Sequence, residues 1–244
     1  MTDQNTPVAV VTGGNRGIGA DIARRFLDAG YVVVNISRQK PELKHPKFHS
    51  FEADLADMKA TADVAAEIAR AHNVTVFVHN AGVIRPALLE AVKLEDLEYL
   101  TNLHLGSAIL LAQAFLPAMR AAKYGRIVLI SSRGVLGLAT RTNYAATKAG
   151  QMGMVRTWAV ELAPEGITVN CVAPGPIETD MFHEVIPAQS EQARKVAASV
   201  PVRRLGTPAD VGRVVAFLCE PDSGFITGQT WYVCGGASLG ALAL

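Results

Sequence analysis

The amino-acid sequence predicts one α/β domain, in which a seven-stranded, mostly parallel sheet carries helices on both faces. Short apolar runs of strand length alternate with amphipathic stretches of helix length along the chain. The 244 residues are enough for one sizeable core, and no internal repeat, low-complexity tract or Pro/Gly-rich linker divides them. Residues 1–244 are therefore expected to form a single domain with a covered parallel sheet.

Seven apolar runs predict the strands. Several consist almost wholly of aliphatic residues without polar alternation, which is typical of strands buried on both faces. We expect strands at residues 8–12, 31–36, 47–51, 74–78, 126–130, 167–172 and 230–233.

The helices are predicted from apolar residues at helical spacing. Ile18, Ile22 and Phe26 recur at four-residue intervals, and Gly30 ends the stretch. Ligands of such a sheet bind beyond the carboxyl ends of its strands, so the residues after each apolar run are the candidate site residues. Further helices are expected before Val74 and over residues 94–119 (with a bend), 144–162 and 209–219.

Composition limits the function. The net charge of +1 and the 18% of charged residues give no electrostatic footprint for nucleic acid or for an anionic membrane. The apolar runs are strand-sized and residues 1–7 lack the layout of a signal peptide, so no membrane span and no secretion are expected. The widely spaced Cys171, Cys219 and Cys234 fit buried free thiols in a reducing cytoplasm, without metal-binding spacing.

A glycine-rich segment, Thr12-Gly-Gly-Asn-Arg-Gly-Ile-Gly19, joins the first strand to the first helix. Glycine lets a backbone turn tightly and approach a ligand, and a helix start offers free N–H groups and a positive dipole end to a pyrophosphate. An ordinary glycine-rich turn is the alternative. The predicted nucleotide-binding residues of this segment are Gly13, Asn15, Arg16, Gly17, Ile18 and Gly19.

The residues after the second strand indicate which dinucleotide is bound. A carboxylate there would bind the ribose hydroxyls of NAD, but the chain has Ser37 and Arg38. A guanidinium matches the additional phosphate of NADP, and Arg16 could reach the same group. These features favour NADP(H) over NAD(H), although either arginine alone could be a surface charge.

Tyr144 and Lys148 lie four residues apart on a predicted helix and share one face, while Ser132 follows the fifth strand. A tyrosine acts as an acid–base at neutral pH only if its pKa, ordinarily about 10, is lowered. A neighbouring ammonium and a positively charged nicotinamide would stabilise the phenolate, and the serine hydroxyl could hold a substrate oxygen. An exposed pair on a helix surface is the alternative.

Taken together, these segments resemble the short-chain dehydrogenases/reductases, and most closely their compact branch, which includes the beta-ketoacyl-[acyl carrier protein] reductases. The resemblance runs over nearly the whole chain and implies a Rossmann-type, doubly wound fold. It divides the domain into a cofactor half (about 1–130) and a catalytic and substrate half (about 131–244), with a lid at about 180–205. The motifs that carry it are Thr12-Gly-x-x-x-Gly-Ile-Gly19, Asn80-Ala-Gly82, Ser132, Tyr144-Ala-Ala-Thr-Lys148 and Pro174-Gly175.

The resemblance also implies a role for each matching position. Tyr144 would donate and accept the proton, Lys148 would bind the nicotinamide ribose and lower the tyrosine pKa, and Ser132 would orient the carbonyl. The remaining implied cofactor contacts are Asp54 and Leu55 at the adenine, Asn80, Ala81 and Gly82 along the adenosine and ribose, and Pro174, Gly175, Ile177 and Thr179 around the nicotinamide.

Three positions depart from the family pattern. His104 stands where the family has a fourth catalytic residue, an asparagine that steadies a water in a proton relay; Asn102 is near but out of register. We expect His104 to keep the relay in altered form, because imidazole can hold a water and can carry a proton. A packing substitution that slows turnover is the alternative. His79 and Cys234 replace a frequent asparagine and a frequent aspartate, away from the chemistry.

The substrate side and the assembly are less determined. The apolar residues of the implied lid predict either a lipophilic cover or ordinary packing. The apolar tail 237–244 and the resemblance imply a homotetramer built partly from the helices around Leu110 and Met152; alternatively, the tail packs on its own subunit. The apolar lid residues are Met181, Phe182, Val185, Ile186 and Pro187. Three arginines could meet a carboxylate or an anionic acyl carrier, or could be solvated surface residues: Arg85, Arg133 and Arg141.

The predicted function is NADP(H)-dependent hydride transfer between nicotinamide and a ketone or secondary alcohol, with beta-ketoacyl thioesters among the candidate substrates. Two alternatives stay open: an NAD-dependent catabolic alcohol dehydrogenase, and a catalytically weak NADP(H)-binding regulatory module on the same fold. The intact Ser132, Tyr144 and Lys148 favour an enzyme, whereas His104 favours the module. No metal, nucleic acid or membrane partner is expected.

Overall fold

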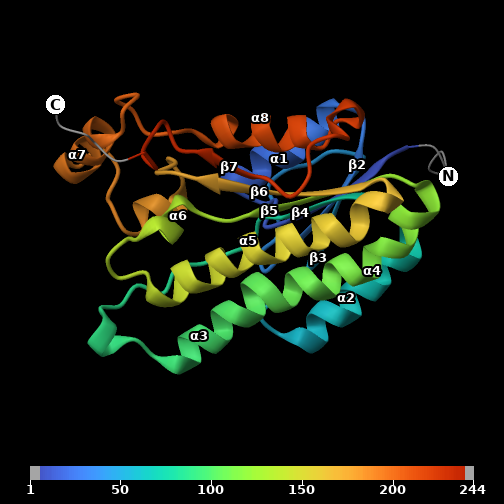
Figure 1. Ribbon diagram of the computed structural model, residues 1–244, viewed down its shortest axis with the longest axis horizontal. Coiled ribbons are helices and arrows are strands. Elements are labelled where there is room, and N and C mark those ends of the chain that lie inside the picture. Colours follow the sequence, from blue (N-terminus) through green and yellow to red (C-terminus); the bar gives the residue numbers. More distant parts are fainter. Residues whose placement is uncertain (1–5, 240–244) are drawn as a thin grey trace.

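The computed structural model describes residues 6–239, and its seven strands form one sheet with helices on both faces (Figure 1). The strand order is β3-β2-β1-β4-β5-β6-β7, and every neighbouring pair is parallel. From β1 the chain adds β2 and β3 on one side, and then returns to add β4 to β7 on the other side. This strand order is that of a doubly wound, Rossmann-type sheet, which confirms the predicted fold class.

The strand predictions hold to within one or two residues. The observed strands are β1 (Val8–Thr12), β2 (Val32–Ser37), β3 (Phe48–Glu52), β4 (Val74–His79), β5 (Gly125–Ile130), β6 (Ile167–Pro174) and β7 (Thr230–Val233). All residues of β1, β2, β5 and β6 are buried, as their continuous apolar runs predicted. The edge strand β3 is partly exposed, which explains its weaker apolar signal.

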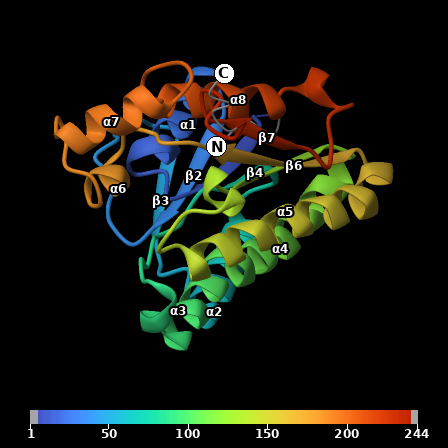
Figure 2. The same cartoon turned by 60° about the vertical axis from the view of Figure 1, so that its left-hand side comes forward.

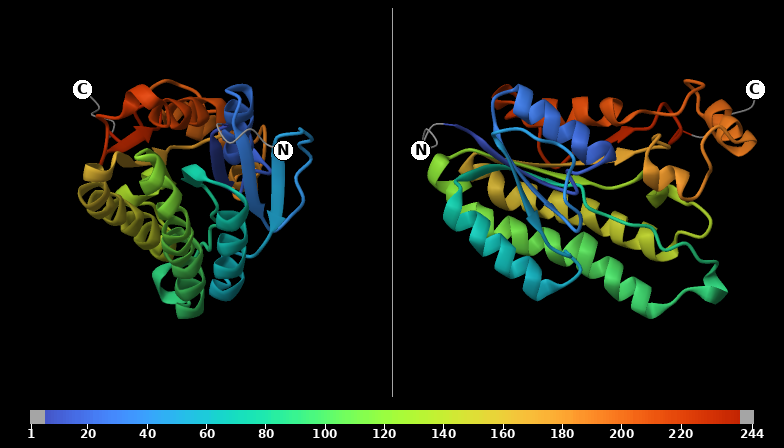
Figure 3. Two further views of the ribbon diagram at one scale, coloured as in Figure 1. Left: turned by 90° about the vertical axis from the view of Figure 1, so that its right-hand side faces the viewer. Right: turned by 180° about the vertical axis from the view of Figure 1, so that it is seen from behind.

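The helices form two layers, one on each face of the sheet (Figure 3). α1 (Gly17–Asp28) and α8 (Pro208–Leu218) pack on one face, and α2 (Met58–Ala71), α4 (Ser107–Ala122) and α5 (Thr142–Leu162) on the other. Each layer buries its own apolar cluster against the sheet. Phe77 of β4 meets Phe115 of α4 edge to face, with ring centres 5.4 Å apart. Short 3₁₀ turns occupy Leu89–Ala91, Arg133–Leu136, Ala163–Glu165 and Pro221–Ser223.

The helix predicted over residues 94–119 contains a π-helical turn. α3 (Leu94–Thr101) continues through Asn102–Gly106 in π-helical geometry into α4. This run, Leu94–Ala122, is long and apolar enough to cross a membrane by length and composition, with a mean hydropathy of 1.4 in its most apolar window. It packs against α2, β4 and β5, however, in the manner of a core helix.

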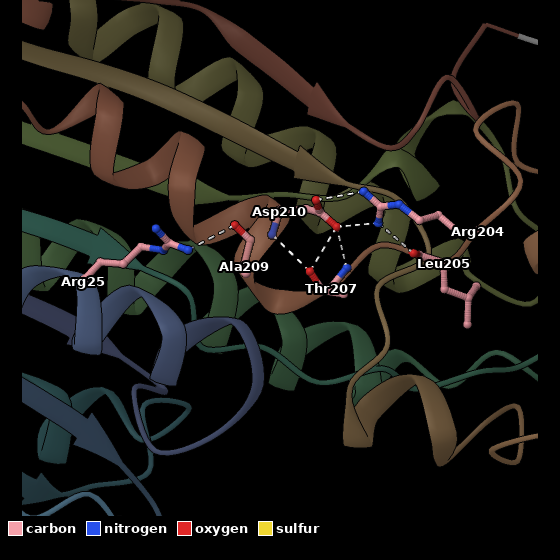
Figure 4. A network of polar contacts seen from close by, with 6 residues as sticks. All are labelled: Arg25, Arg204, Leu205, Thr207, Ala209 and Asp210. Atoms are coloured by element: carbon pink, nitrogen blue, oxygen red, sulfur yellow. Dashed lines mark hydrogen bonds and ion pairs between the residues drawn. The ribbon is translucent and has the colours of Figure 1, made fainter.

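The segment after β6 contains two helices that the sequence analysis did not predict. These are α6 (Asp180–His183) and α7 (Glu191–Ser199), which lie together at one end of the sheet (Figure 2). The far end of the segment is fixed to α8 by Thr207, which forms a capping box with Asp210 (Figure 4). Arg204 donates to both carboxylate oxygens of Asp210, at 2.7 and 3.0 Å. The segment that the sequence analysis predicted as a lid is therefore held to α8 at its C-terminal end.

The three cysteines are free and buried, as predicted. Burial raises the pKa of Cys171 to about 11 and that of Cys219 to about 12, so these thiols are unreactive at neutral pH. Within residues 6–239 no cluster of His, Cys, Asp and Glu could hold a metal ion.

Candidate active site

A cavity of about 680 Å³ runs along the edge of the sheet where the carboxyl ends of the strands meet. All but two of the residues predicted as site residues line this one cleft. The exceptions are Gly19 and His104, which lie behind its wall, against Gly13 and Gly82. The lining residues are Gly13, Asn15, Arg16, Gly17, Ile18, Ser37, Arg38, Asp54, Leu55, Asn80, Ala81, Gly82, Ser132, Tyr144, Lys148, Pro174, Gly175, Ile177 and Thr179.

The glycine loop, residues 12–19, forms a concave backbone surface, which we call the glycine cradle. Side chains at the glycine positions would occupy its space. Gly13 and Gly17 have φ angles of +66° and +54°, in the left-handed region that glycine adopts without strain. A Cβ on Gly19 would overlap the carbonyl oxygen of Gly13 and lie 2.6 Å from Nδ2 of Asn80. Arg16 is the N-cap of α1, and no side chain caps the helix, so its first N–H groups stay open to an anion. The loop therefore fits a dinucleotide pyrophosphate.

Thr12 and Asn80 hold the loop to the end of β4. Thr12 Oγ1 accepts hydrogen bonds from the backbone N–H groups of Asn80 and Ala81, at 3.0 and 2.9 Å. Asn80 Nδ2 donates to the carbonyl oxygens of Thr12 and Gly13, at 3.0 and 3.2 Å. The resemblance gave Asn80 a place along the adenosine and ribose. In this structure its amide nitrogen is committed to the loop, so Asn80 shapes the cleft as well as lining it.

Asn35 is a site residue that the sequence analysis missed. It is buried in β2, where its Oδ1 accepts a hydrogen bond from the backbone N–H of Gly14 at 2.7 Å. Its Nδ2 donates to Ser37 Oγ at 3.0 Å and to Ser50 Oγ at 2.9 Å. A single amide inside an otherwise apolar strand is costly unless it is hydrogen-bonded, and that was the available signal.

Two arginines lie at the end of the cleft beside β2. Arg38 is exposed and donates from Nη1 to the hydroxyl of Tyr99 at 3.3 Å. Arg16 pairs with Asp180 and Glu184 of the lid, at 3.6 and 3.8 Å. No carboxylate follows β2, where Ser37, Arg38 and Gln39 line the cavity. This end of the cleft thus offers cations to a phosphate.

Ser132, Tyr144 and Lys148 meet at the opposite end of the cleft. Ser132 follows β5 and accepts a hydrogen bond from the backbone N–H of Gly134 at 3.0 Å. Tyr144 and Lys148 lie one turn apart on α5, and Lys148 Nζ is 5.9 Å from the centre of the tyrosine ring. The two side chains face the cleft, as the sequence analysis required.

Burial is the largest influence on the pKa values of Tyr144 and Lys148. Burial raises the pKa of Tyr144, and a hydrogen bond with Ser132 and the charge of Arg141 oppose that rise. Burial also lowers the pKa of Lys148 to about 7. The Nζ of Lys148 donates to the carbonyl oxygen of Ile130 at 2.7 Å.

A buried network of side chains holds Lys148. Its Nζ also donates to Oε1 of Gln151 at 3.3 Å, and Gln151 Nε2 donates to the carbonyl oxygen of His104 at 3.0 Å. His79 Nε2 donates to Ser107 Oγ at 2.8 Å, because the Ser107 hydroxyl itself donates to the Leu103 carbonyl. Gln151, which the sequence analysis missed, lies 3.5 Å from the other nitrogen of His79. The lysine is thus fixed from behind.

His104 is fully buried in the π-helical turn, between Thr147 and Gly82. Thr147 Oγ1 donates to backbone carbonyls of its own helix, so it accepts from Nδ1–H of His104 at 2.8 Å. Nε2 of His104 then carries no hydrogen, and it has no partner within the described residues. A Cβ on Gly82 would lie 3.0 Å from this Nε2 and 3.4 Å from Lys148 Nζ, which places both nitrogens around one point.

Both buried histidines are neutral. Burial, and then the charge of Lys148, holds the pKa of His104 far below its ordinary value. The same two causes lower the pKa of His79 to about 3. His104 is therefore a hydrogen-bond acceptor beside Lys148 and is not protonated in the physiological pH range.

The segment after β6 forms one wall of the cleft. Gly175 packs against the backbone of Cys234, where a Cβ would lie 2.7 Å from the cysteine Cα. Thr179 caps α6 and faces Gly17 across the cleft. Beyond it the lid lines the cavity with Met181, Phe182, Val185 and Ile186, whereas Pro187 is not part of the wall.

Comparisons with known proteins agree over nearly the whole chain. Residues 13–238 match the family model described as Enoyl-(Acyl carrier protein) reductase. The BbsD subunit of (2S)-[(R)-hydroxy(phenyl)methyl]succinyl-CoA dehydrogenase from Thauera aromatica is 39% identical, over 95% of this chain and 96% of that protein. The 3-oxoacyl-[acyl-carrier-protein] reductase MabA of Mycobacterium tuberculosis is 38% identical, over 95% of this chain and 92% of that protein.

A solved structure shares both the fold and the sequence pattern. It is described as an NAD(P) dependent gluconate 5-dehydrogenase from Beutenbergia cavernae, with NADP bound at low occupancy. Its TM-score to this chain is 0.86 at 33% identity, over 96% of this chain and 97% of that one.

Proposed function

Because the chain belongs to the short-chain dehydrogenase/reductase family of oxidoreductases, we propose that it transfers hydride between NADP(H) and a ketone or secondary alcohol within this cleft. One observation carries the proposal. The glycine cradle and the trio of Ser132, Tyr144 and Lys148 line the same cavity, at its two ends. A dinucleotide held at the cradle would place its nicotinamide at the trio.

The residues of the cleft fit NADP(H). The open start of α1 and the glycine cradle suit the pyrophosphate, and Arg38 and Arg16 suit the additional phosphate. When bound, the nicotinamide supplies or accepts the hydride at the substrate carbon. We assign Asp54, Leu55, Ala81 and Gly82 to the adenosine side, and Pro174, Gly175, Ile177 and Thr179 to the nicotinamide side.

Proton transfer falls to the trio. Tyr144 gives its phenolic proton to the carbonyl oxygen in reduction and takes it back in oxidation. Ser132, within hydrogen-bonding reach of the phenol, orients the same oxygen. Lys148 binds the ribose beside the nicotinamide, and Gln151 positions it from behind.

His104 serves this site as a neutral acceptor. A water between its bare Nε2 and Lys148 Nζ would satisfy the unpartnered nitrogen and link the lysine to the helix. This role replaces proton carrying by an imidazolium, which the burial of His104 disfavours. His104 acts through Lys148 and is a positioning residue.

The assembly and the location are part of the proposal. Val160 of α5 and Ile109 of α4 expose apolar surface on the helical face. Trp231 of β7 and Phe225, which precedes β7, do so at the edge of the sheet. These patches support self-association, and we propose a homotetramer, whose mass light scattering would measure. The buried free thiols fit the cytoplasmic location that we propose with it. Of the apolar tail, Leu239 is exposed, and residues 240–244 lie outside the described residues.

Deuterium transfer tests the function directly. The protein is incubated with NADPH carrying deuterium at the 4-position and with a panel of aryl ketones, keto acids and beta-ketoacyl thioesters. We expect deuterium at the carbinol carbon of at least one product. Tight NADPH binding with no turnover of the whole panel would instead support a regulatory module, for which the departure at His104 is the motivating feature.

A further inference from the structure

Arg141 is a buried cation at the catalytic end of the cleft. It immediately precedes α5, lines the cavity and is only 9% exposed. Its guanidinium Nη1 donates to the hydroxyl of Thr140 at 2.5 Å and lies 3.4 Å from the carbonyl oxygen of the same residue. Within residues 6–239 it makes no ion pair with a carboxylate. Arg141 is therefore not a solvated surface residue. Arg85, in contrast, is exposed and pairs with Asp96.

The unused N–H groups of Arg141 open on the cleft. A guanidinium has five N–H donors, and the contacts with Thr140 occupy only Nη1. Nε and Nη2 make no hydrogen bond with the described residues, and neither is sealed from solvent. Since the side chain is otherwise buried and lines the cavity, these donors face into it.

No acidic side chain compensates this charge in the described part of the cleft. The two acids among its lining residues lie elsewhere: Asp180 pairs with Arg16, and Asp54 accepts a hydrogen bond from the Ala56 N–H. Arg133, the other arginine at this end, donates from Nε to the carbonyl oxygen of Ala237 at 3.0 Å. Arg141 therefore has open N–H donors and no acidic partner among the described lining residues, so an anionic group of a ligand would be stabilised here.

We propose that the substrate carries a carboxylate that pairs with Arg141 while its carbonyl or hydroxyl group faces Ser132 and Tyr144. This inference rests on the proposed function and names its substrate class: keto acids, and the hydroxy acids they give on reduction, with an apolar portion against Met181 and Phe182. A guanidinium fork binds a carboxylate with two parallel hydrogen bonds. Because Arg141 is the N-cap of α5, three residues before Tyr144, the carboxylate belongs to the reacting molecule itself rather than to a distant carrier.

The carboxylate takes no part in the bond changes. Hydride adds to the carbonyl carbon and the Tyr144 proton to its oxygen, so the acid group is the same before and after. Its pairing with Arg141 contributes to orientation and specificity.

The test compares an acid with its neutral ester in matched variants. NADPH oxidation is followed with 4-oxo-4-phenylbutanoate and with its methyl ester, for the wild type, Arg141→Gln and Arg85→Gln. Arg85 is the control because it pairs with Asp96 and lies outside the cleft wall. The measured quantity is the ratio of kcat/KM for acid over ester, because the Arg141 charge also acts on Tyr144 and affects both substrates.

We expect the wild type and Arg85→Gln to prefer the acid by roughly 10- to 100-fold, in line with a charge-assisted hydrogen bond. In Arg141→Gln the ratio should fall to within about threefold of unity, the change that a lost carboxylate partner predicts. An equal preference in Arg141→Gln and the wild type, or no preference for the acid in the wild type, would overturn the inference.

A binding measurement separates failure of the inference from failure of the proposed function. The fluorescence of bound NADPH is titrated with 4-phenylbutanoate and with 4-phenylbutanamide. If the ester is reduced but the carboxylate binds no better than the amide, the inference fails and the oxidoreductase stands. If NADPH does not bind and neither ketone is reduced, the proposed function fails. If NADPH binds without turnover, the affinities of the two compounds decide. Tighter binding of the carboxylate than of the amide supports the inference when Arg141→Gln abolishes the difference. Equal affinities of the wild type for the two compounds overturn it.

Discussion

The two ends of the cleft are built from different parts of the chain. At the cofactor end the surface is mostly backbone and small residues, arranged by one contiguous segment, the loop from Thr12 to Gly19. The catalytic end depends on side chains from four distant segments: Ser132 and the α5 residues line the cleft, and His79 and His104 lie behind its wall. A short motif supplies the loop of the first end, which Asn35 and Asn80 hold in place, whereas the second end has no contiguous motif.

This difference also governs the electrostatics. The cofactor end uses an open helix start and exposed arginines, whose charges are solvated. The catalytic end buries its ionisable groups, so burial raises the pKa of Tyr144 and lowers that of Lys148 to about 7. Changes at the cofactor end should therefore affect binding, and changes at the catalytic end should affect turnover.

The largest effect at the cofactor end is expected from Gly19→Ala. The added Cβ would overlap the Gly13 carbonyl oxygen and press on Asn80, so the loop must move. We expect the free energy of unfolding to fall by about 1–3 kcal/mol, as for other overpacked sites. NADPH affinity should fall with it, measured by fluorescence titration.

Gly153→Ala is the matched control. Gly153 lies in α5, is exposed, and has nothing within 4 Å of a built Cβ. Alanine there should stabilise the helix by about 0.5–1 kcal/mol and leave NADPH binding unchanged. Equal effects of the two substitutions, in chemical unfolding and in titration, would contradict the close-packed cradle.

A smaller effect, confined to cofactor choice, is expected from Arg38→Asp. Removing the guanidinium and adding a carboxylate should lower the preference for NADPH over NADH by roughly 10- to 100-fold, as for a lost charge-assisted hydrogen bond. Lys40→Asp changes the net charge equally but lies outside the cleft wall, so its preference should match the wild type. An unchanged preference in Arg38→Asp would remove Arg38 from the specificity argument.

The smallest effect at the catalytic end is expected from His104. His104→Leu removes the acceptor beside Lys148, so kcat should fall about tenfold, as for one lost hydrogen bond of about 1.5 kcal/mol. His104→Asn keeps an acceptor and should restore part of the loss. Since His104 stays neutral, neither variant should change the shape of the pH–rate profile. A lost inflection in both variants would show instead that His104 carries protons.

The sequence predicts contiguous features better than features that distant segments form together. The strands and the glycine loop depend on contiguous patterns, and their predicted positions agree with the structure to within a few residues. Asn35 was missed because it is one polar residue in a largely apolar strand, and Gln151 because it is one of many polar residues of α5. The partners of both are visible only after folding. Arg141 could not be separated from a surface arginine, because burial depends on packing of segments far apart in the chain. The short helices α6 and α7 lack a long apolar period.

The central claim is that the Tyr144 phenol carries the proton in a cleft that also binds the dinucleotide. The most direct measurement is a paired one on Tyr144→Phe: NADPH affinity by titration, and turnover of a ketone that the wild type reduces. We predict an affinity within about threefold of the wild type and a kcat lower by about 10²–10⁴, the usual contribution of a general acid–base group. Turnover at the wild-type rate in this variant would contradict the account.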